Sequence, residues 1–469
     1  MSLSSSLFSG ISGLSTFGNA MQILGDNIAN VNTIGFKSSH FTFQDLLSQS
    51  VATSSGSAQV GRGTTLGSIM GSFEQGSFES TGNTTDLAIG GEGFFTVREA
   101  GAENYYYTRA GNFSFDENGQ LTNPEGLILQ GWKLDENGDD VGSKTDIVMS
   151  SFTSPPDETT ETQAIVNLDS DGLNNSSGSN TALSAAWDAT AVEPLGENAY
   201  EYQTTLLVYD SLGSTHDVTM YFDKGETDSV YEYILTSNPA EDNRSGASGQ
   251  TWQGLLSRGL INFDTSGAIT SVTMDRFDAA TTGWVAQAPA TDLTDGHFTY
   301  TPSFISGTPM EIQLNLGTHY DGTTWVNGSL TTTSYAVPST TTFESSNGYG
   351  AGDLENVTVD VDGTMTGHYS NGQLAPLYRV SLAKFQNEQG LLKKGGSLYS
   401  ETKDSGEAIT SKPGTNGLGS ISPNSLEQSN VDIADELVKM ITTQRGFQAN
   451  SKIITVTDQM LQDLINIKR

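Results

Sequence analysis

The sequence predicts an α+β protein that is mainly β, with one helix at each end of the chain and β domains between them. Apolar residues recur at helical spacing near the N-terminus and again near the C-terminus, and these two observations predict the helices. A third predicts the β class: Gly, Ser, Thr and Asn are abundant, and short alternating stretches are separated by turn residues. A chain of 469 residues has room for several domains.

The first 37 residues carry an apolar seam. Its gaps of three or four residues average 3.5, which is the period of a helix that packs against another helix. The seam residues, which we expect to form subunit contacts, are Leu3, Leu7, Ile11, Leu14, Phe17, Met21, Leu24, Ile28 and Val31. Asp26 is the only charged residue before Lys37, and so little charge suits burial among other helices.

The last forty residues show a wider apolar face, which predicts more than one neighbour. The expected contact residues are Ile433, Leu437, Met440, Phe447, Ile454 and Leu461. Asn430 or Asp432 is the expected N-cap. Because the first helix is rich in Gly and Ser, it would be marginal alone. We therefore expect the two ends to become ordered on each other and on neighbouring copies; a single antiparallel pair within a monomer is the alternative.

Charge is distributed unevenly along the chain. The net charge is −34, of which residues 1–60 carry −1 and residues 431–469 carry none, so the middle carries −33. Neutral ends and an acidic middle are typical of ends that pack together and a middle that faces solvent. This charge argues against nucleic-acid binding and against anionic membrane surfaces. No stretch approaches a membrane span, and the start lacks the basic and apolar regions of a secretory signal.

The pattern predicts a nested organisation, in which segments from the two ends of the chain combine and the middle region is inserted between them. Residues 1–35 and 430–469 form a terminal helical core domain, coiled-coil-like, and 36–80 form an extended, irregular connector. Residues 81–148 and 356–425 combine into an inner β domain, into which 149–355 are inserted as an outer β domain. A clear hairpin is expected over 202–222, turning at Asp210 to Gly213. Whether 220–347 form an extra subdomain stays open.

Chemistry-bearing patterns are weak throughout. There is no Cys, which excludes disulfides and thiolate sites, and no two of the five His are close in sequence. Acidic turns such as Asp360 to Gly363 faintly resemble calcium loops but lack the closing Glu of an EF-hand. The five Trp could form a sugar platform, although core packing is the default. The sequence therefore predicts no catalytic residue, no cofactor, no metal site and no enzymatic activity.

Both ends carry specific motifs. Residues 27–37 read NIANVNTIGFK, and residues 426–432 and 444–450 read LEQSNVD and QRGFQAN. Together they resemble the N- and C-terminal signatures of the bacterial flagellar rod and hook proteins. The segments DLAIGGEGFF (86–95) and YTRAGNF (107–113) are also similar to this family, so the resemblance covers about 1–148 and 350–469. The signature residues are Asn27, Asn30, Asn32, Gly35, Phe36, Asn430, Val431, Asp432 and Arg445.

The inserted region indicates which member of the family this chain resembles. Rod proteins are much shorter, whereas TLLVYDSLGSTH (205–216) and NGYGAGDL (347–354) resemble the outer domain of the hook proteins. The resemblance implies a structural subunit that self-assembles into a curved, hollow extracellular tube, the universal joint that transmits torque from rod to filament. It implies export by the flagellar type III apparatus without signal cleavage. It also implies contacts with distal rod, hook cap and hook–filament junction proteins. The alternatives are a distal rod or other axial protein and, in another class, an acidic secreted glycan-binding or glycan-active β protein.

Overall fold

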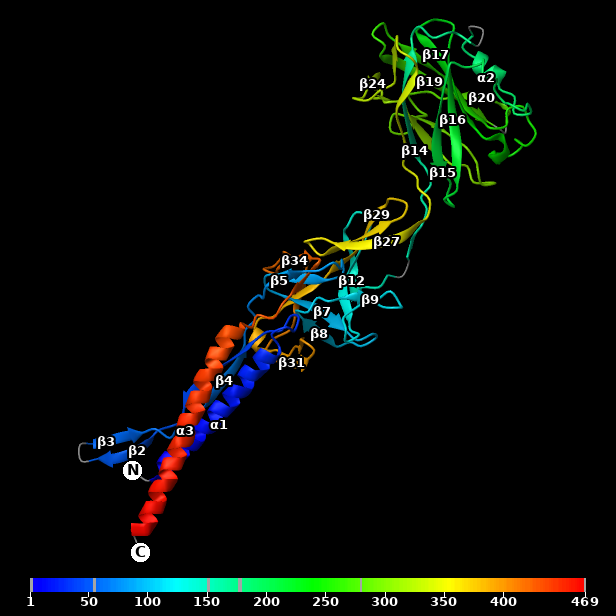
Figure 1. The fold of residues 1–469 in the computed structure, drawn as a ribbon. Coiled ribbons are helices and arrows are strands. Elements are labelled where there is room, and N and C mark those ends of the chain that lie inside the picture. Colours follow the sequence, from blue (N-terminus) through cyan, green and yellow to red (C-terminus); the bar gives the residue numbers. More distant parts are fainter. Residues whose placement is uncertain (1–2, 54–55, 150–151, 176–178, 279–280, 468–469) are drawn as a thin grey trace. The chain divides into compact units, whose positions relative to one another are not determined.

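The computed structural model describes residues 3–53, 56–149, 152–175, 179–278 and 281–467. The chain divides into two compact units. The terminal unit comprises Met1–Phe152, Leu354–Tyr369 and Gln373–Arg469, and the middle unit comprises Thr153–Asp353 and Ser370–Gly372. The structure is mainly β, with a long helix near each end of the chain (Figure 1).

The two long helices, α1 (Leu3–Ala29) and α3 (Ile433–Ile467), lie side by side and run in opposite directions (Figure 1). Turns over 30–35 end α1, and Gly35 there takes a φ of +65°, which favours glycine. The Asp432 carboxylate caps α3 by accepting hydrogen bonds from the Ala434 and Asp435 amides, at 2.7 and 3.3 Å. Of the two expected N-caps, Asp432 is therefore the one that the structure uses.

The segment expected to be an irregular connector is paired instead, so that part of the prediction is wrong. Strand β1 (Ser39–Asp45) forms an antiparallel ladder with β4 (Thr64–Gly71), and β2 (Gln49–Thr53) forms one with β3 (Gly56–Val60). β5 (Phe78–Ser80) pairs with β35 (Ser425–Glu427). The reason is cross-strand packing: Phe41 faces Ile69 in the ladder, and the Phe43 ring meets the Phe17 ring of α1 at 5.3 Å.

In the rest of the terminal unit, strands from 87–146 and from 354–423 share one core. The main sheet path is β27 (Gly352–Val359), β28 (Thr364–Tyr369), β29 (Leu374–Val380), β11 (Ile128–Leu134), β7 (Phe94–Arg98), β8 (Tyr105–Thr108), β32 (Leu398–Ser400) and β31 (Leu392–Gly395). Strands joined to this path are β9 (Ser114–Phe115), β10 (Leu121–Thr122), β12 (Asp140–Asp146), β30 (Leu382–Lys384) and β33 (Ile409–Ser411). A separate ladder joins β6 (Leu87–Gly90) to β34 (Ser420–Pro423).

The middle unit packs two sheets around one core. The first sheet is antiparallel, in the order β15 (Tyr202–Tyr209), β16 (Thr215–Lys224), β17 (Val230–Ser237), β18 (Leu255–Phe263), β19 (Ile269–Asp278) and β20 (Gly283–Ala286). The second contains β21 (Phe298–Tyr300), β22 (Ile312–Asn315), β14 (Glu161–Asp169), β25 (Thr333–Tyr335) and β26 (Thr340–Ser346). Shorter elements are β13 (Thr153–Ser154), α2 (Ala182–Ala186), β23 (Thr318–Tyr320) and β24 (Trp325–Asn327).

The expected hairpin is confirmed as β15 and β16, which turn at 210–214. Along β15, Thr204, Leu206 and Val208 point into the core while their neighbours face outward, as the alternating sequence requires. The core contains apolar side chains from 164–168, 206–222 and from strands as late as Leu314. Residues 220–347 therefore share this core with β14 and β15.

Candidate assembly interface

The two terminal helices approach closely where glycines remove side chains. A Cβ atom added at Gly13 would lie 2.6 Å from the Asn450 amide oxygen, and one added at Gly446 would lie 2.6 Å from the Phe17 ring. Each glycine thus forms a recess that a side chain of the other helix fills. Helix interiors normally disfavour glycine by about 1 kcal/mol, so these positions exchange helix propensity for close packing.

The expected contact residues on α1 are mostly half-buried within the single chain. Leu24 is fully buried, and Ile11 is 47% exposed. The half-buried residues are Leu7, Leu14, Phe17, Met21, Ile28 and Val31, the last of which follows the helix. The side chain of Leu3 lies outside the described residues. One face of α1 is therefore partly covered by α3 and by β1 and β4.

Helix α3 leaves much more apolar surface uncovered. Among its expected contact residues, Met440, Phe447, Ile454 and Leu461 are half-buried, whereas Ile433 and Leu437 are exposed. Further exposed apolar side chains of α3 are Val438, Ile441, Ile453, Val456 and Met460. The antiparallel pair within one chain thus exists, but it buries only part of the apolar face. These side chains form two groups, over 433–441 and 453–460, and exposed apolar groups of this kind are typical of a protein–protein contact.

Asn27 fastens the end of α1 to two other segments. Its buried side chain amide donates to the Ser39 carbonyl at 2.9 Å and to the Glu436 carboxylate at 3.1 Å, while its oxygen accepts from the Ser39 amide at 2.9 Å. Lys439 donates to the other oxygen of Glu436 at 2.7 Å. This network fixes the first turn of α3 against the last turn of α1.

A buried charge cluster lies just beyond that point. Lys37 donates to Glu427 at 2.6 Å and to the Glu74 carbonyl at 2.7 Å, and Arg109 reaches the other Glu427 oxygen at 3.4 Å. All three side chains are nearly inaccessible to water. Burial lowers the pKa of Lys37 and of Arg109, and the attraction of Glu427 opposes both shifts. The cluster joins the N-terminal signature, the β sheet and the C-terminal signature.

Gly35 and Asn430 complete this junction. The Gly35 amide donates to the Glu427 carbonyl at 2.8 Å, and a Cβ atom at Gly35 would lie 2.4 Å from the Ala110 nitrogen, so no larger residue fits. The Asn430 side chain accepts from the Ser38 amide at 2.8 Å and donates to the Ser72 carbonyl at 2.9 Å. These signature residues hold backbone segments together.

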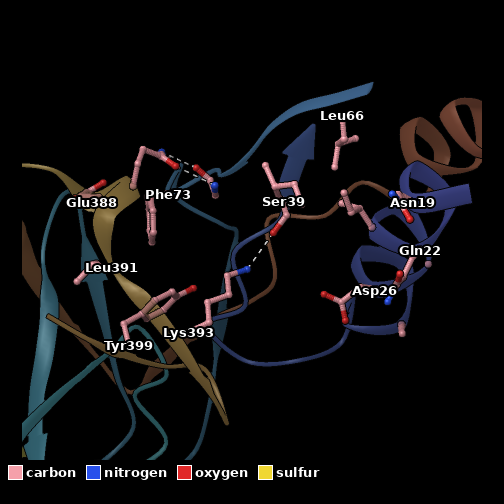
Figure 2. Close-up of a pocket in the computed structure, with 16 residues that line it drawn as sticks. Asn19, Gln22, Asp26, Ser39, Leu66, Phe73, Glu388, Leu391, Lys393 and Tyr399 are labelled. Carbon is pink, nitrogen blue, oxygen red and sulfur yellow. Dashed lines mark hydrogen bonds between the residues drawn. The ribbon is translucent and has the colours of Figure 1, made fainter. Parts of the chain in front are cut away.

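A groove of about 860 Å³ opens between α1, β4 and residues 388–399 (Figure 2). Lys393 lines it and donates to the Ser39 hydroxyl at 3.0 Å, and Gln389 makes two hydrogen bonds with the Gly71 backbone. Burial lowers the pKa of Lys393 and raises that of Glu388. Through these bonds Lys393 and Gln389 tie residues 388–393 to strands β1 and β4.

The remaining signature residues do not converge on one place. Phe36 lies 5.4 Å below the Lys393 ammonium, and Asn30 donates to the Asp26 carbonyl one turn earlier. Asn32 and Arg445 are exposed, and Val431 is half-buried. The signature is thus a set of backbone fasteners and surface residues and does not enclose a pocket for a reacting group.

Comparison with known proteins gives matches along the chain. Four family models match: "Flagella basal body rod protein" over 7–37, "Flagellar hook protein FlgE/F/G D1 domain" over 88–172, "Flagellar basal body protein FlaE D2 domain" over 167–349 and "Flagellar basal body rod FlgEFG protein C-terminal" over 422–467. The flagellar hook protein FlgE of Borreliella burgdorferi is 33% identical over 99% of both chains, and that of Treponema pallidum is also 33% identical over 99% of both. The chain belongs to the flagellar hook protein family.

Among solved structures, the flagellar hook protein FlgE2 of Helicobacter pylori matches 75% of this chain and 100% of its own, with a TM-score of 0.41 and 15% identity. The full-length match to hook proteins decides between the hook and the shorter rod proteins that the terminal motifs also resemble. As a hook protein, the chain is a structural component of the flagellum.

The sequence analysis did not predict three residues that form the junction in this hook protein: Arg109, Glu427 and Glu436. All three lie in or beside quoted motifs; Arg109 and Glu427 are charged residues among apolar, amide and small neighbours, whereas Glu436 follows Asp435 and shows no such isolation. That isolation was the available signal, since a charge that is held in an apolar motif tends to have a buried partner. The partners of these charges could not be predicted from the sequence, because 390 residues separate Lys37 from Glu427.

In the part of the chain that the structure describes, no group of three or more His, Asp or Glu side chains is arranged to hold a metal ion. No helix in the described ranges combines the length and the apolar character needed to cross a membrane. Trp187 is buried, and Trp325 packs on the core of the middle unit, as expected of core residues.

Proposed function

We propose that this hook subunit assembles through its terminal helices, which pack against those of neighbouring copies to form the inner wall of a tube. The observation that carries the proposal is the exposed apolar face of α3, where Leu437, Val438 and Ile441 are 44, 62 and 50% exposed. Burying a half-exposed aliphatic side chain contributes about 1 kcal/mol, so a row of them on every copy supports a stable polymer. In this proposal the helices are coiled-coil-like and the β domains are nested outside them.

The proposal extends to the working of the hook. The β domains form the outer shells of a curved tube that transmits torque from rod to filament while bent. Firm apolar contacts between helices hold the tube together, while the acidic surfaces further out make solvated contacts that re-form at little cost. Its partners are other copies of the chain, distal rod, hook cap and hook–filament junction proteins. The chain leaves the cell through the flagellar export apparatus without a cleaved signal peptide.

Negative-stain electron microscopy tests the assembly element. The full chain and a version lacking 1–36 and 431–469 are compared under salting-out conditions. We expect tubes from the full chain and none from the shortened one. Tryptophan fluorescence should show that the shortened chain keeps its middle unit folded, since four of the five Trp lie there. Tubes from both chains, or from neither, would contradict the proposal.

A further inference from the structure

The middle unit has an excess of negative charge that a polymer must accommodate. Residues 153–353 contain 26 Asp and Glu but only four Lys and Arg. Copies of such a unit repel one another when assembly brings them close, and the repulsion falls with salt. A direct contact between neighbours is therefore favoured wherever a cation is free to meet a carboxylate.

Three of the four cations are already engaged. Lys224 is buried and donates to the Ser170 carbonyl at 2.6 Å. Arg244 makes two hydrogen bonds to the Asp242 carboxylate, at 2.9 and 2.7 Å. Arg258 bonds Asp275 at 3.1 Å and lies 4.3 Å over the Trp284 ring.

The fourth cation, Arg276 on β19, is different. It is half-buried, yet no hydrogen bond or ion pair joins its guanidinium to another residue in the described part of the chain. The nearby Asp292 attracts it, but the oxygens of that carboxylate accept from the Ala288 amide and the Thr291 hydroxyl instead. No Arg276 nitrogen is among the buried, unpaired side-chain atoms of the described residues, so the guanidinium stays within reach of water and of a group from another copy.

A pocket of about 640 Å³ adjoins this guanidinium. Arg276, Arg244, Ser245 and Ser303 line it. Arg244 is paired with Asp242 and the Ser303 hydroxyl donates to the Ile305 carbonyl, so Arg276 supplies the available positive charge. Asp278 also lines it, but its carboxylate accepts a hydrogen bond from the Thr281 hydroxyl at 2.7 Å. The pocket is thus suited to a small anionic group.

We propose that this pocket binds a carboxylate side chain from the middle unit of a second copy. A planar guanidinium can hold both oxygens of a carboxylate, which gives orientation as well as attraction. Exposed turn residues such as Glu226 and Asp228 offer that group on the surface of every copy. An open helical polymer needs contacts between two different patches, as a pocket and an acidic turn are. The inference rests on the proposed function, because it requires assembled copies.

Zero-length cross-linking of an Arg276→Lys variant tests the contact. A carbodiimide joins the amine introduced at position 276 to any carboxylate that it touches, and mixing ¹⁵N-labelled with unlabelled copies distinguishes links between copies from links within one. We expect mixed-label links from position 276 in assembled polymer and at least a tenfold loss of them in unassembled chain. The matched control is Arg258→Lys, which should link to Asp275 within its own copy in both states.

The outcomes separate this inference from the proposed function. Polymer whose position 276 links only within its own copy would overturn the carboxylate contact and leave helix-driven assembly intact. Wild-type chain that forms no polymer would overturn both. A second variant, Arg276→Gln, should raise the critical concentration for assembly several-fold without shifting the urea midpoint of the monomer. An unchanged critical concentration would also count against the contact.

Discussion

At the scale of single residues, the junction depends on one buried carboxylate. Glu427 receives Lys37 and Arg109 together with the Gly76 amide at 2.9 Å. Buried ions cost several kcal/mol each unless they are paired, so the two cations are tolerated only because Glu427 is there. The same carboxylate ties the β5–β35 ladder to the N-terminal signature, which explains how one charge can secure three segments.

Replacing Glu427 with Gln should therefore destabilise the terminal unit strongly. Gln keeps the shape and still accepts from Gly76, but it leaves Lys37 and Arg109 buried without a counter-charge. We expect the free energy of unfolding to fall by about 3–5 kcal/mol in urea denaturation. The control is Glu92→Gln, which breaks an exposed pair with Lys384 and should change stability by less than about 1 kcal/mol. Equal effects of the two substitutions would refute this account.

Acid sensitivity of the middle unit depends on Asp242. Burial raises the pKa of this carboxyl, but the hydrogen bonds and charge of Arg244, together with the Gly254 amide, outweigh burial and hold the pKa below its usual value. Because the folded pKa is the lower one, the stabilisation is present above the unfolded value of about 3.9 and is lost as the pH falls through the folded pKa.

An Asp242→Asn variant should be less stable than the wild type at pH 7, and the difference should shrink at pH 3. Urea unfolding followed by tryptophan fluorescence measures this, since Trp252 lies 5.5 Å from the Arg244 guanidinium. A difference that is as large at pH 3 as at pH 7 would mean that the ionised carboxylate does not provide the stabilisation.

At the scale of elements, glycines determine how closely the helices pack. Gly446 receives the Phe17 ring, whereas nothing lies within 4 Å of a Cβ atom placed at Gly18. Alanine at either position improves helix propensity by about 0.5–1 kcal/mol, but at Gly446 it also collides with a ring. The same substitution should thus have opposite effects at two places in one helix pair.

We expect Gly446→Ala to lower the stability of the helix pair by about 1–3 kcal/mol through overpacking, and Gly18→Ala to raise it slightly. Thermal unfolding followed by far-ultraviolet circular dichroism compares the two variants with the wild type. Stabilisation by Gly446→Ala would show that the helices separate without cost at this point.

The elements also show what sequence reasoning can reach. Apolar spacing predicted both helices, the turn from Asp210 to Gly213 predicted the β15–β16 hairpin, and local capping chemistry narrowed the N-cap of α3 to Asn430 or Asp432. Each of these signals is local, because it depends on residues that are only a few positions apart in the chain. The β1–β4 ladder and the Lys37–Glu427 pair escaped because they join segments far apart in the chain, and no local pattern specifies such partners.

At the scale of the whole molecule, charge and apolar surface are separated along the chain. The ends are neutral and leave apolar side chains on α3 exposed, while the middle carries nearly all of the net charge. Apolar contacts give attraction at short range, and like charges keep the acidic units apart in solution. This separation favours polymers held by their helices over disordered aggregates.

The exposed face of α3 should therefore matter for assembly and not for folding. In a Val438→Gln, Ile441→Gln double variant, the substituted side chains remain good helix formers, so the unfolding free energy of the monomer should change by less than about 0.5 kcal/mol. Each lost apolar contact in the polymer is worth about 1 kcal/mol, which together predicts a critical concentration at least tenfold higher. Sedimentation of polymer at graded protein concentrations measures the critical concentration, and urea denaturation measures the monomer. A monomer that loses stability to the same extent would place these side chains in an internal contact, and an unchanged critical concentration would show that neighbouring copies do not cover them.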